Sequence, residues 1–499
     1  MRNLYINPLL IADQYKLSHR DQLEKGTTLI YSNTTPRKSR VDGVDKVVVF
    51  GIQYFIIEYL IERFNKDFFE LQEADVVDSF ERICDNSLGV GSIKSDHVRA
   101  LHRLGYLPLK IKCLPEGTLC PIGFPMCTIY NTHPDFAWLT NFVETICQNV
   151  IWRMITSATD MLQFRKLADD FAERTSSIPE FVDFQFHTFA MRGNDGLESA
   201  CMCDAGHLLS FRGSDTIPTI PFMEKYYGAD SDLELISASV PASEHAIMCS
   251  YGDKNELETF RMFIEDIYPT GIVSIVSDTW DLTEIINPDN GYLAKLKDKI
   301  LNRDGKVVIR PDSSDKTPLE IICGDPEPDS RYTNRQSKVI NKGVIRCLDE
   351  IFGHTVNDKG YKELNTKIGC IYGECINYTL AKKIFKTLEN MGYASTNIVF
   401  GIGSFEHMYG KTRDTYGLAC KATYCEVNGE KRNIFKNPVT DTGMKKSHKG
   451  LMMIDKNWNL HQECTWEEEN KGLLETVFEN GILVKHHTLA EIRERIKNG

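Results

Sequence analysis

Seven short apolar runs, each ending at a polar or charged residue, cross the middle of this 499-residue chain. Buried parallel strands are continuous runs of β-branched and aromatic residues, and functional groups gather at their carboxyl ends. Because stretches with helical periodicity separate the runs, the sequence predicts parallel βα units that form a barrel with a polar rim. The runs are Asp183–Phe189, Leu208–Phe211, Ile236–Val240, Ile272–Val276, Val307–Ile309, Ile368–Tyr372 and Ile398–Phe400.

The regions before and after these runs have a different character. Residues 1–150 mix strand-like and helical segments, and residues 421–499 contain Asn428-Gly429 and Asn480-Gly481, pairs that favour tight hairpins. We therefore expect a barrel over residues 151–420 and a second domain to which residues 1–150 and 421–499 both contribute. The clearest helices are expected at Thr219–Tyr227, Asn255–Glu265, Thr279–Ile286 and Thr379–Met391, and an exposed insertion at Asp325–Ser337.

The composition excludes several classes of function. A formal net charge of −12 argues against a broad nucleic-acid surface, although it permits a local basic pocket for a phosphorylated small molecule. The 15 cysteines include no CxxC pair, so we expect reduced thiols in a cytoplasmic protein rather than a disulfide framework or a zinc ribbon. The first 16 residues lack the pattern of a signal peptide, and no apolar stretch is long enough to span a bilayer.

The most informative single residue is His245, which follows a predicted strand and the turn-forming Pro241, with Glu244 beside it. A histidine at this position can be a general base, a metal ligand or a phosphoryl acceptor. It can equally be a histidine whose hydrogen bonds only stabilise the strand end. Metal binding is the weaker functional interpretation, because the chain has no HxxxH or HExxH spacing.

Further polar groups follow the later runs. Arg310 offers a planar fork that suits phosphate, and Asp312 can accept ribose hydroxyls or bind Mg²⁺, although an ion pair at the strand end explains both as well. Gly401 and Gly403 permit close approach of a phosphate to the backbone, but a plain tight turn is the commoner explanation. The cations at Arg413, Lys421, Lys436, Lys445, Lys446 and Lys449 indicate either a solvated basic face or a pyrophosphate clamp.

The chain resembles the nicotinamide phosphoribosyltransferase family, which belongs to the type II phosphoribosyltransferases. The resemblance extends over almost the whole length of the chain. A single matching motif would be weak, whereas several in the same order are highly specific. The matching stretches are Asp13–His19, His187–Gly193, Phe211–Thr216, Ser239–His245, Val276–Asp278, Ile309–Ser313, Thr412–Asp414, Phe435–Lys436 and Pro438–Val439.

The resemblance implies an irregular α/β barrel, a second, mostly β domain and a homodimer with active sites shared across the interface. It implies transfer of phosphoribose from phosphoribosyl pyrophosphate to nicotinamide, which gives nicotinamide mononucleotide and pyrophosphate in NAD salvage. Mg²⁺ is the implied cofactor, and ATP is the implied co-substrate that assists turnover through a phosphohistidine at His245. The partners implied are these small molecules and a second copy of the chain, with neither nucleic acid nor membrane.

The resemblance also implies roles for individual residues. Phe189 and the partner subunit's Tyr15 would sandwich the pyridine ring, and Asp215 would accept the carboxamide N–H. The implied catalytic residues are His245, Glu244 and Asp312, and the implied metal ligands are Asp278 and Asp312. The implied ribose and phosphate contacts are Arg192, Ser274, Arg310, Asp312, Gly373, Glu374, Gly403 and Ser404. The implied pyrophosphate contacts, across the interface, are Arg37, Arg413, Lys421, Lys436 and Lys445.

The chain departs from the family pattern at a few of these positions. Glu374 stands where the family has an aspartate, Ser404 interrupts a glycine-rich stretch, and Ala419 replaces a serine. The nearest alternative function is that of a nicotinate phosphoribosyltransferase, against which Asp215 argues because a carboxylate repels nicotinate. The other alternative is a non-catalytic nucleotide-binding homologue, against which the retained His245 and the basic residues argue.

Overall fold

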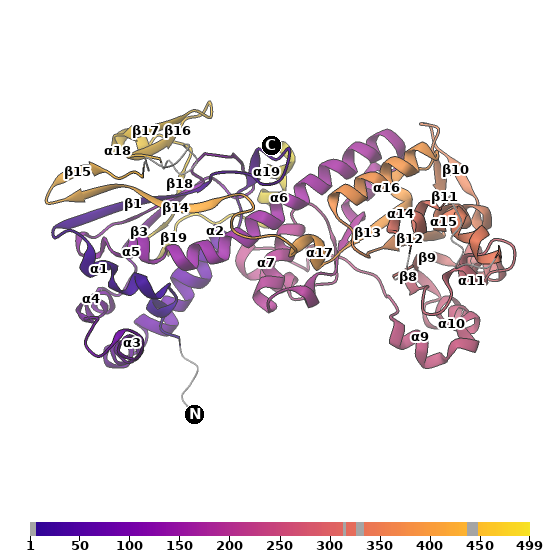
Figure 1. Ribbon diagram of the computed structural model, residues 1–499, viewed down its shortest axis with the longest axis horizontal. Coiled ribbons are helices and arrows are strands. Elements are labelled where there is room, and N and C mark those ends of the chain that lie inside the picture. The colour runs from indigo at the N-terminus through magenta and orange to yellow at the C-terminus, as the bar shows by residue number, and fades with distance from the viewer. Residues whose placement is uncertain (1–5, 313–315, 326–333, 437–447) are drawn as a thin grey trace. The chain divides into compact units, whose positions relative to one another are not determined.

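Five of the seven apolar runs in the middle of the chain contribute strands to a parallel sheet in the computed structural model, which describes residues 6–312, 316–325, 334–436 and 448–499 (Figure 1). This sheet belongs to the second of two units, which comprises Asp160–Ile220 and Ser231–Gly410. Its strands, in spatial order, are β7 (Gly213–Ser214), β6 (Phe186–Thr188), β13 (Ile398–Ile402), β12 (Ile368–Tyr372), β9 (Asp304–Arg310) and β8 (Thr270–Val276).

An irregular segment links the two edge strands of this sheet and thereby completes the barrel. Ser214 N donates to Ala238 O over 3.0 Å, so the segment begins beside β7. Ser274 N donates to Pro241 O, and Ser243 N donates to Ser274 O, each over 2.9 Å, so the same segment ends beside β8. The run Ile236–Val240 was expected to form a strand, and it instead has one isolated parallel bridge, between Ala238 and Gly213, while a second bridge joins Ala242 just beyond the run to Ser274.

Helices and a dense apolar core surround the sheet of the second unit. Aromatic residues from several elements meet there, with ring centroids 5.1 Å apart for Phe164 and Phe186, and 5.4 Å apart for Phe186 and Phe400. The helices are α7 (Leu197–His207), α9 (His245–Tyr251), α10 (Glu256–Met262), α11 (Leu282–Ile286), α12 (Tyr292–Lys295), α13 (Lys297–Asn302), α14 (Pro318–Cys323), α15 (Asn334–Phe352), α16 (Tyr378–Asn390) and α17 (Ser404–His407). A hairpin, β10 (His354–Val356) and β11 (Lys362–Leu364), lies outside the parallel sheet.

A second expected strand, Leu208–Phe211, was also wrong. Leu208–Phe211 follows directly on α7 as a turn, and the strand of this region is the two-residue β7 farther along the chain. Leu208 and Phe211 are buried, as the apolar pattern required, but a short apolar run cannot distinguish a strand from the buried end of a helix. The expected insertion at Asp325–Ser337 falls mostly outside the described residues.

The first unit comprises Met1–Thr159, Pro221–Asp230 and Lys411–Gly499 and is built on an antiparallel sheet. Its strands, in spatial order, are β15 (Glu430–Asn433), β14 (Leu418–Val427), β1 (Thr27–Pro36), β5 (Cys127–Asn131), β3 (Leu109–Cys113), β18 (Glu475–Glu479) and β19 (Ile482–Leu483). Strands from the early part of the chain form the centre of this sheet, and strands from its late part flank them on both sides, since β1 pairs with β14 and β3 pairs with β18.

The two predicted hairpins of the first unit are confirmed. Asn428 and Gly429 have φ of 51° and 77° between β14 and β15, and Asn480 and Gly481 have φ of 50° and 83° between β18 and β19. Positive φ at both central residues is what a two-residue hairpin turn of the favoured twist requires.

Smaller elements complete the first unit. Two further strand pairs are β2 (Lys46–Val48) with β4 (Leu119–Pro121), and β16 (Leu451–Ile454) with β17 (Leu460–Cys464). Its helices are α1 (His19–Gln22), α2 (Ile52–Tyr54), α3 (Glu73–Leu88), α4 (Asp96–Leu104), α5 (Leu139–Phe142), the beginning of α6 (Glu144–Thr175), most of α8 (Thr219–Tyr227), α18 (Trp466–Glu469) and α19 (Leu489–Asn498). No helix in the described part of the chain has both the length and the apolar character needed to cross a bilayer.

Candidate functional site

The carboxyl ends of the parallel strands bring most of the predicted site residues of the second unit to one edge of the sheet. Because all six strands run in the same direction, residues that follow them lie at the same rim. The residues placed there are Phe189 after β6, Asp215 after β7, Asp278 after β8, Arg310 and Asp312 at the end of β9, Gly373 and Glu374 after β12, and Gly403 and Ser404 after β13. Glu244 and His245 follow the irregular segment that completes the barrel.

Asp215 accepts two hydrogen bonds from protein side chains. The Nε2 atom of His187 lies 2.9 Å from Asp215 Oδ1, and the Ser239 hydroxyl donates to the same oxygen over 2.6 Å. Burial alone would raise the pKa of Asp215, but the His187 contact, the Ser239 hydrogen bond and the charge of Arg310 lower it below the ordinary value. Asp215 is therefore an anion at neutral pH, and half of its side chain is exposed.

The Phe189 ring lies where three glycines leave room for it. A Cβ atom on Gly401 would be 2.0 Å from Phe189 Cε1, one on Gly373 would be 2.5 Å from Phe189 Cζ, and one on Gly403 would be 3.2 Å from Phe189 Cε2. Phe189 N donates to Ile402 O over 3.1 Å, which fixes the backbone beside β13. Side chains at these glycines would displace the ring, so the strand ends act as a seat for one aromatic face.

Phe189 and Asp215 occupy neighbouring positions at the rim. His187 pairs with Gly213 and Thr188 pairs with Ser214 in the parallel ladder of β6 and β7. The next step along the ladder is a hydrogen bond from Asp215 N to Thr188 O, over 2.9 Å. An aromatic ring and an ionised carboxylate are thus presented side by side, which suits a planar ligand with an amide substituent.

His245 begins helix α9 and contacts a carboxylate from the next strand. Its Nε2 atom lies 3.1 Å from Asp278 Oδ1, and its Nδ1 atom lies 3.9 Å from Asp312 Oδ2. Asp278 is 4% exposed, whereas His245 is 43% exposed, so a buried carboxylate orients a histidine that solvent can reach. Glu244, beside His245 in sequence, has an exposed side chain at the start of α9.

Arg310 is tied to the turn that carries His245. Its Nη2 atom donates to Ser243 O over 2.6 Å, and the Ser243 hydroxyl accepts a hydrogen bond from Val276 N over 2.9 Å. Arg310 Nε is buried and has no protein partner among the described residues. A buried donor without a partner is costly, so this nitrogen is available to a ligand oxygen.

The remaining predicted ligand contacts of the second unit differ in accessibility. Arg192 lies in an exposed turn, Glu374 is exposed, and Gly403 and Ser404 are half-buried at the start of α17. Ser274 is only 4% exposed, and its backbone pairs with the barrel-completing segment. Burial raises the pKa of Tyr372 at the end of β12, and the charges of Glu374, Asp312 and Asp278 raise it further.

The first unit carries the aromatic and basic residues that a partner subunit is expected to contribute to the site. Tyr15 is 59% exposed, and Arg37, Arg413, Lys421 and Lys436 are exposed as well. The backbones of Arg37 and Arg413 lie at the same end of the β1–β14 pair, since Arg37 N donates to Gly417 O and Leu418 N donates to Arg413 O. Lys445 lies outside the described residues.

A chain of polar contacts links the neighbourhood of Tyr15 to Arg413. Lys16 Nζ lies 2.7 Å from Glu144 Oε2, Gln148 Nε2 donates to Glu144 Oε1 over 3.2 Å, and Arg413 Nη1 donates to Gln148 Oε1 over 2.8 Å. Lys16 and Gln148 are 5% exposed. The exposed Tyr15 ring and the exposed Arg413 are therefore fixed to the same end of α6.

The carboxylates at the rim suit Mg²⁺ when phosphate oxygens of a substrate supply further ligands. In the described part of the chain no cluster of three or more histidine, cysteine or acidic side chains is arranged to hold a metal ion. Mg²⁺ is commonly bound by one or two carboxylates together with phosphate oxygens of a substrate. Asp312, whose side chain is 45% exposed, and the adjacent Asp278 could supply these carboxylates.

His187 was given no role from the sequence, although its spacing carried a signal. In the predicted run Asp183–Phe189, His187 and Phe189 are two residues apart and would point to the same face of a strand, whereas in the structure β6 ends at Thr188, just before Phe189. Ser239 lies within the apolar run Ile236–Val240 and was given no role either. Buried Asp204 also went unnoticed; the Ser214 hydroxyl contacts its Oδ1 over 2.8 Å, directly before Asp215.

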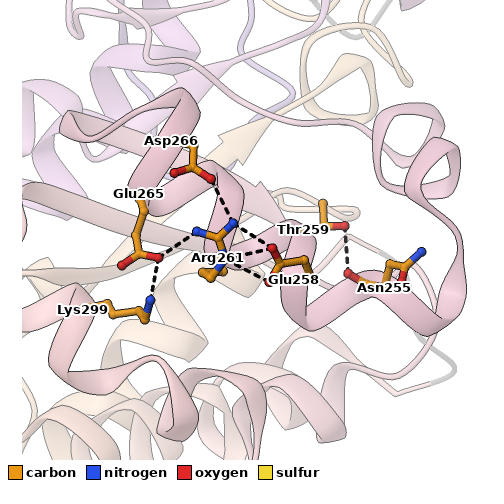
Figure 2. Close-up of polar contacts among 7 residues, drawn as sticks. All are labelled: Asn255, Glu258, Thr259, Arg261, Glu265, Asp266 and Lys299. Atoms are coloured by element: carbon orange, nitrogen blue, oxygen red, sulfur yellow. Dashed lines mark hydrogen bonds and ion pairs between the residues drawn. The ribbon is translucent and has the colours of Figure 1, made fainter.

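A separate polar cluster on α10 is fully paired with itself (Figure 2). Arg261 contacts Glu258, Glu265 and Asp266 over 2.7, 3.0 and 2.9 Å, and Lys299 contacts Glu265 over 2.6 Å. Each of these charged groups has a partner within the cluster, so we interpret the cluster as structural.

Comparisons with known proteins agree on one family. Residues 184–482 match the nicotinate phosphoribosyltransferase (NAPRTase) family, and residues 7–79 match the nicotinamide phosphoribosyltransferase N-terminal domain. The chain is 45% identical over 505 aligned positions to a nicotinamide phosphoribosyltransferase of Acinetobacter baylyi, covering 98% of this chain and 97% of the relative. It is 32% identical to one of Mycoplasma pneumoniae, covering 88% and 94%. The fold is similar to a nicotinate-nucleotide pyrophosphorylase from Pyrococcus furiosus, with a TM-score of 0.54, 15% identity, and coverage of 100% and 98%.

Proposed function

Because the chain belongs to the nicotinamide phosphoribosyltransferases of the NAPRTase family, we propose that it transfers phosphoribose from phosphoribosyl pyrophosphate to nicotinamide. The products are nicotinamide mononucleotide and pyrophosphate, and the role is NAD salvage. The observation that favours nicotinamide over nicotinate as the pyridine substrate is the ionised Asp215 beside the Phe189 ring.

The two residues complement nicotinamide in different ways. The pyridine ring offers mainly its π-faces, so Phe189 on one side and a second aromatic residue on the other suit it. The carboxamide N–H donates to Asp215. Nicotinate would instead place a carboxylate against that anion, a like-charge contact that disfavours it.

The remaining rim residues suit the ribose and phosphates. In the transfer, the pyridine nitrogen forms a bond to ribose C1′ with its lone pair while the C1′–O bond to pyrophosphate breaks, and pyrophosphate leaves with that electron pair. No proton is transferred, so no general base is required. Positive charge builds on the ribose, and the carboxylates of Asp312 and Glu374 stabilise it, while Arg310 and Arg192 hold phosphate oxygens.

Mg²⁺ and ATP are part of the proposal. Asp278 and Asp312 would hold Mg²⁺ together with phosphate oxygens, and the ion would neutralise charge on the leaving pyrophosphate. His245 is proposed to accept the γ-phosphoryl of ATP, because Asp278 orients its ring and its side chain is accessible. Glu244, exposed at the start of the same helix, is proposed to assist at this position.

A homodimer is proposed to supply the rest of the site. The partner subunit's Tyr15 would cover the second face of the pyridine ring, and the basic residues of that same unit would bind pyrophosphate. A cytoplasmic location is also proposed; every cysteine lies in the described part of the chain and is a free thiol, as a reducing compartment requires.

The test compares the two pyridines directly. Purified protein is incubated with phosphoribosyl pyrophosphate and either nicotinamide or nicotinate, with and without ATP, and the products are identified by mass spectrometry. We expect nicotinamide mononucleotide, with a kcat/KM for nicotinamide on the order of a hundredfold or more above that for nicotinate. Asp215→Asn should narrow the difference, and equal values in the parent would contradict the choice of base.

A further inference from the structure

The contacts of Asp215 point to a positioning residue with no assigned role in the reaction. His187 lies on β6, two residues before Phe189, and its side chain is 15% exposed. We propose that His187 sets the amide-over-acid selectivity of the site by holding Asp215 in one orientation with one carboxylate oxygen free. This inference rests on the proposed transfer to nicotinamide.

The geometry of the carboxylate supports this role. Both side-chain contacts of Asp215, from His187 Nε2 at 2.9 Å and from the Ser239 hydroxyl at 2.6 Å, fall on Oδ1. In the described part of the chain Oδ2 has no such donor, and it is the oxygen left for a ligand N–H. Because Asp215 is ionised, His187 must present an N–H at Nε2, which makes it a donor to the carboxylate.

A glycine on β7, Gly213, leaves room for the His187 ring. A Cβ atom on Gly213 would lie 2.7 Å from His187 Nδ1, closer than real Cβ contacts permit. Gly213 faces His187 across the β6–β7 ladder, and its carbonyl oxygen is held by His207 Nε2 over 3.0 Å. The imidazole thus packs directly against the backbone of β7 and contacts Asp215 through Nε2.

Several charged groups act on Asp215 besides His187. Arg310 lowers the pKa of Asp215 from the β9 side, and the negative charge of Asp215 contributes to the raised pKa of the buried Asp204 on α7. Loss of the His187 contact would leave the effect of burial on Asp215 opposed by Ser239 and Arg310. The pKa of Asp215 would then rise, and the protonated carboxyl would neither repel nicotinate nor accept the amide as well.

The experiment uses two substitutions of the same residue. His187→Leu removes the donor and keeps the bulk, whereas His187→Gln can place an amide N–H where Nε2 lies. We expect His187→Leu to raise the KM for nicotinamide about tenfold and to lower the nicotinamide-to-nicotinate ratio of kcat/KM by a similar factor, with kcat changed less. His187→Gln should keep most of the selectivity.

The pH profile separates this role from a structural one. In His187→Leu the acid limb of kcat/KM for nicotinamide should move to higher pH, because Asp215 is protonated more readily. A change that only loosened the fold would lower activity without moving that limb.

Gly213→Ala tests the same idea without removing the imidazole, because the added methyl group must displace the His187 ring. Gly369→Ala on β12 is the matched control, since its Cβ would make only ordinary contacts of 3.4 and 3.6 Å. Gly213→Ala should reproduce the loss of selectivity, and Gly369→Ala should retain the parent ratio.

The outcomes distinguish the two proposals. A parent protein that forms no nicotinamide mononucleotide would contradict the proposed function. A selective parent whose His187→Leu and Gly213→Ala variants keep the parent ratio and the parent acid limb would overturn the role of His187 and leave the function intact.

Discussion

At the scale of single residues, the candidate site consists of contacts between side chains that lie far apart in the sequence. The carboxylate that contacts His245 Nε2 is Asp278, 33 residues away, and not the adjacent Glu244. Such pairing depends on which strand ends become neighbours, and a linear pattern carries no information about that. His187 and Asp204 were missed for the same reason, because their roles exist only through Asp215.

The first prediction concerns His245. His245→Ala should abolish ATP hydrolysis and the ATP-dependent decrease in the KM for phosphoribosyl pyrophosphate, because the proposed phosphoryl acceptor is gone. Some ATP-independent transfer should remain, since ribose charge is stabilised by other residues. Labelling with γ-³²P ATP should give an acid-labile, base-stable adduct in the parent only. An equally labelled His245→Ala protein would place the acceptor elsewhere.

The second prediction concerns Asp204, 2% exposed beneath the Asp215 turn. Burial raises the pKa of Asp204 to about 7 from its ordinary 3.8, although the Ser214 hydrogen bond favours the ionised form. The folded state therefore holds a proton that the unfolded chain releases, so this group stabilises the fold fully below pH 4 and loses that contribution as the pH rises to about 7.

Urea denaturation between pH 4 and 8 checks the sign. The free energy of unfolding of the parent should contain a component that falls across this range, and Asp204→Asn should remove it. If the parent and the variant show the same dependence on pH, Asp204 does not titrate as its burial indicates.

At the scale of elements, local signals were predictable and closure of the barrel was not. The two Asn-Gly hairpins and strands β12 and β13 followed from turn chemistry and from apolar runs. Leu208–Phe211 was mistaken for a strand because burial is the same at the end of a helix. The segment from Ala238 to Ser243 completes the barrel through isolated bridges, a pairing that depends on the two edge strands being in place.

The third prediction concerns the glycine seat formed by Gly373, Gly401 and Gly403. Gly401→Ala would place a methyl group 2.0 Å from Phe189 Cε1, so the ring must move. We expect a loss of about 1–3 kcal/mol in the free energy of unfolding and a KM for nicotinamide raised about tenfold. Thermal denaturation and steady-state kinetics measure the two effects.

A double substitution provides the control. Gly401→Ala with Phe189→Leu should regain stability relative to Gly401→Ala alone, because the smaller side chain accommodates the methyl group, yet it should not regain nicotinamide affinity. A Gly401→Ala protein with parent stability and parent KM would show that the ring does not depend on this seat.

At the scale of the whole molecule, the predicted site residues are divided between the two units. The rim of the parallel sheet carries Phe189 and Asp215, and the antiparallel unit carries Tyr15 and Arg413 on a common polar network. The apolar runs and their polar ends indicated part of the rim, whereas the role of Tyr15 and its place across a subunit interface were implied only by the resemblance to the family. A second subunit is the proposed answer to how the two groups of residues come together.

The fourth prediction tests that answer by mixing inactive proteins. Tyr15→Ala lacks the residue proposed to act in trans, and Arg310→Ala lacks one that acts at the rim. Each homodimer should have little activity. In a heterodimer one site combines both defects and the other has none, so mixing should restore up to about half of the parent activity per exchanged dimer. No recovery after subunit exchange has been verified by native mass spectrometry would contradict a shared site.

The position of the early strands between late strands in the antiparallel sheet also governs how the chain can fold during synthesis. Strands β1 and β3 emerge from the ribosome well before their partners β14 and β18. At about 5–20 residues per second, the stretch from Asn131 to Leu418 takes on the order of tens of seconds to translate. The parallel unit, which closes within residues 160–410, can fold in that interval, whereas the first strands must wait with unpaired edges. Limited proteolysis of nascent chains stalled after residue 440 should find the parallel unit protected and the leading segment cleaved. Strands β1 and β3 would then need chaperones until β14 and β18, which are made last, pair with them.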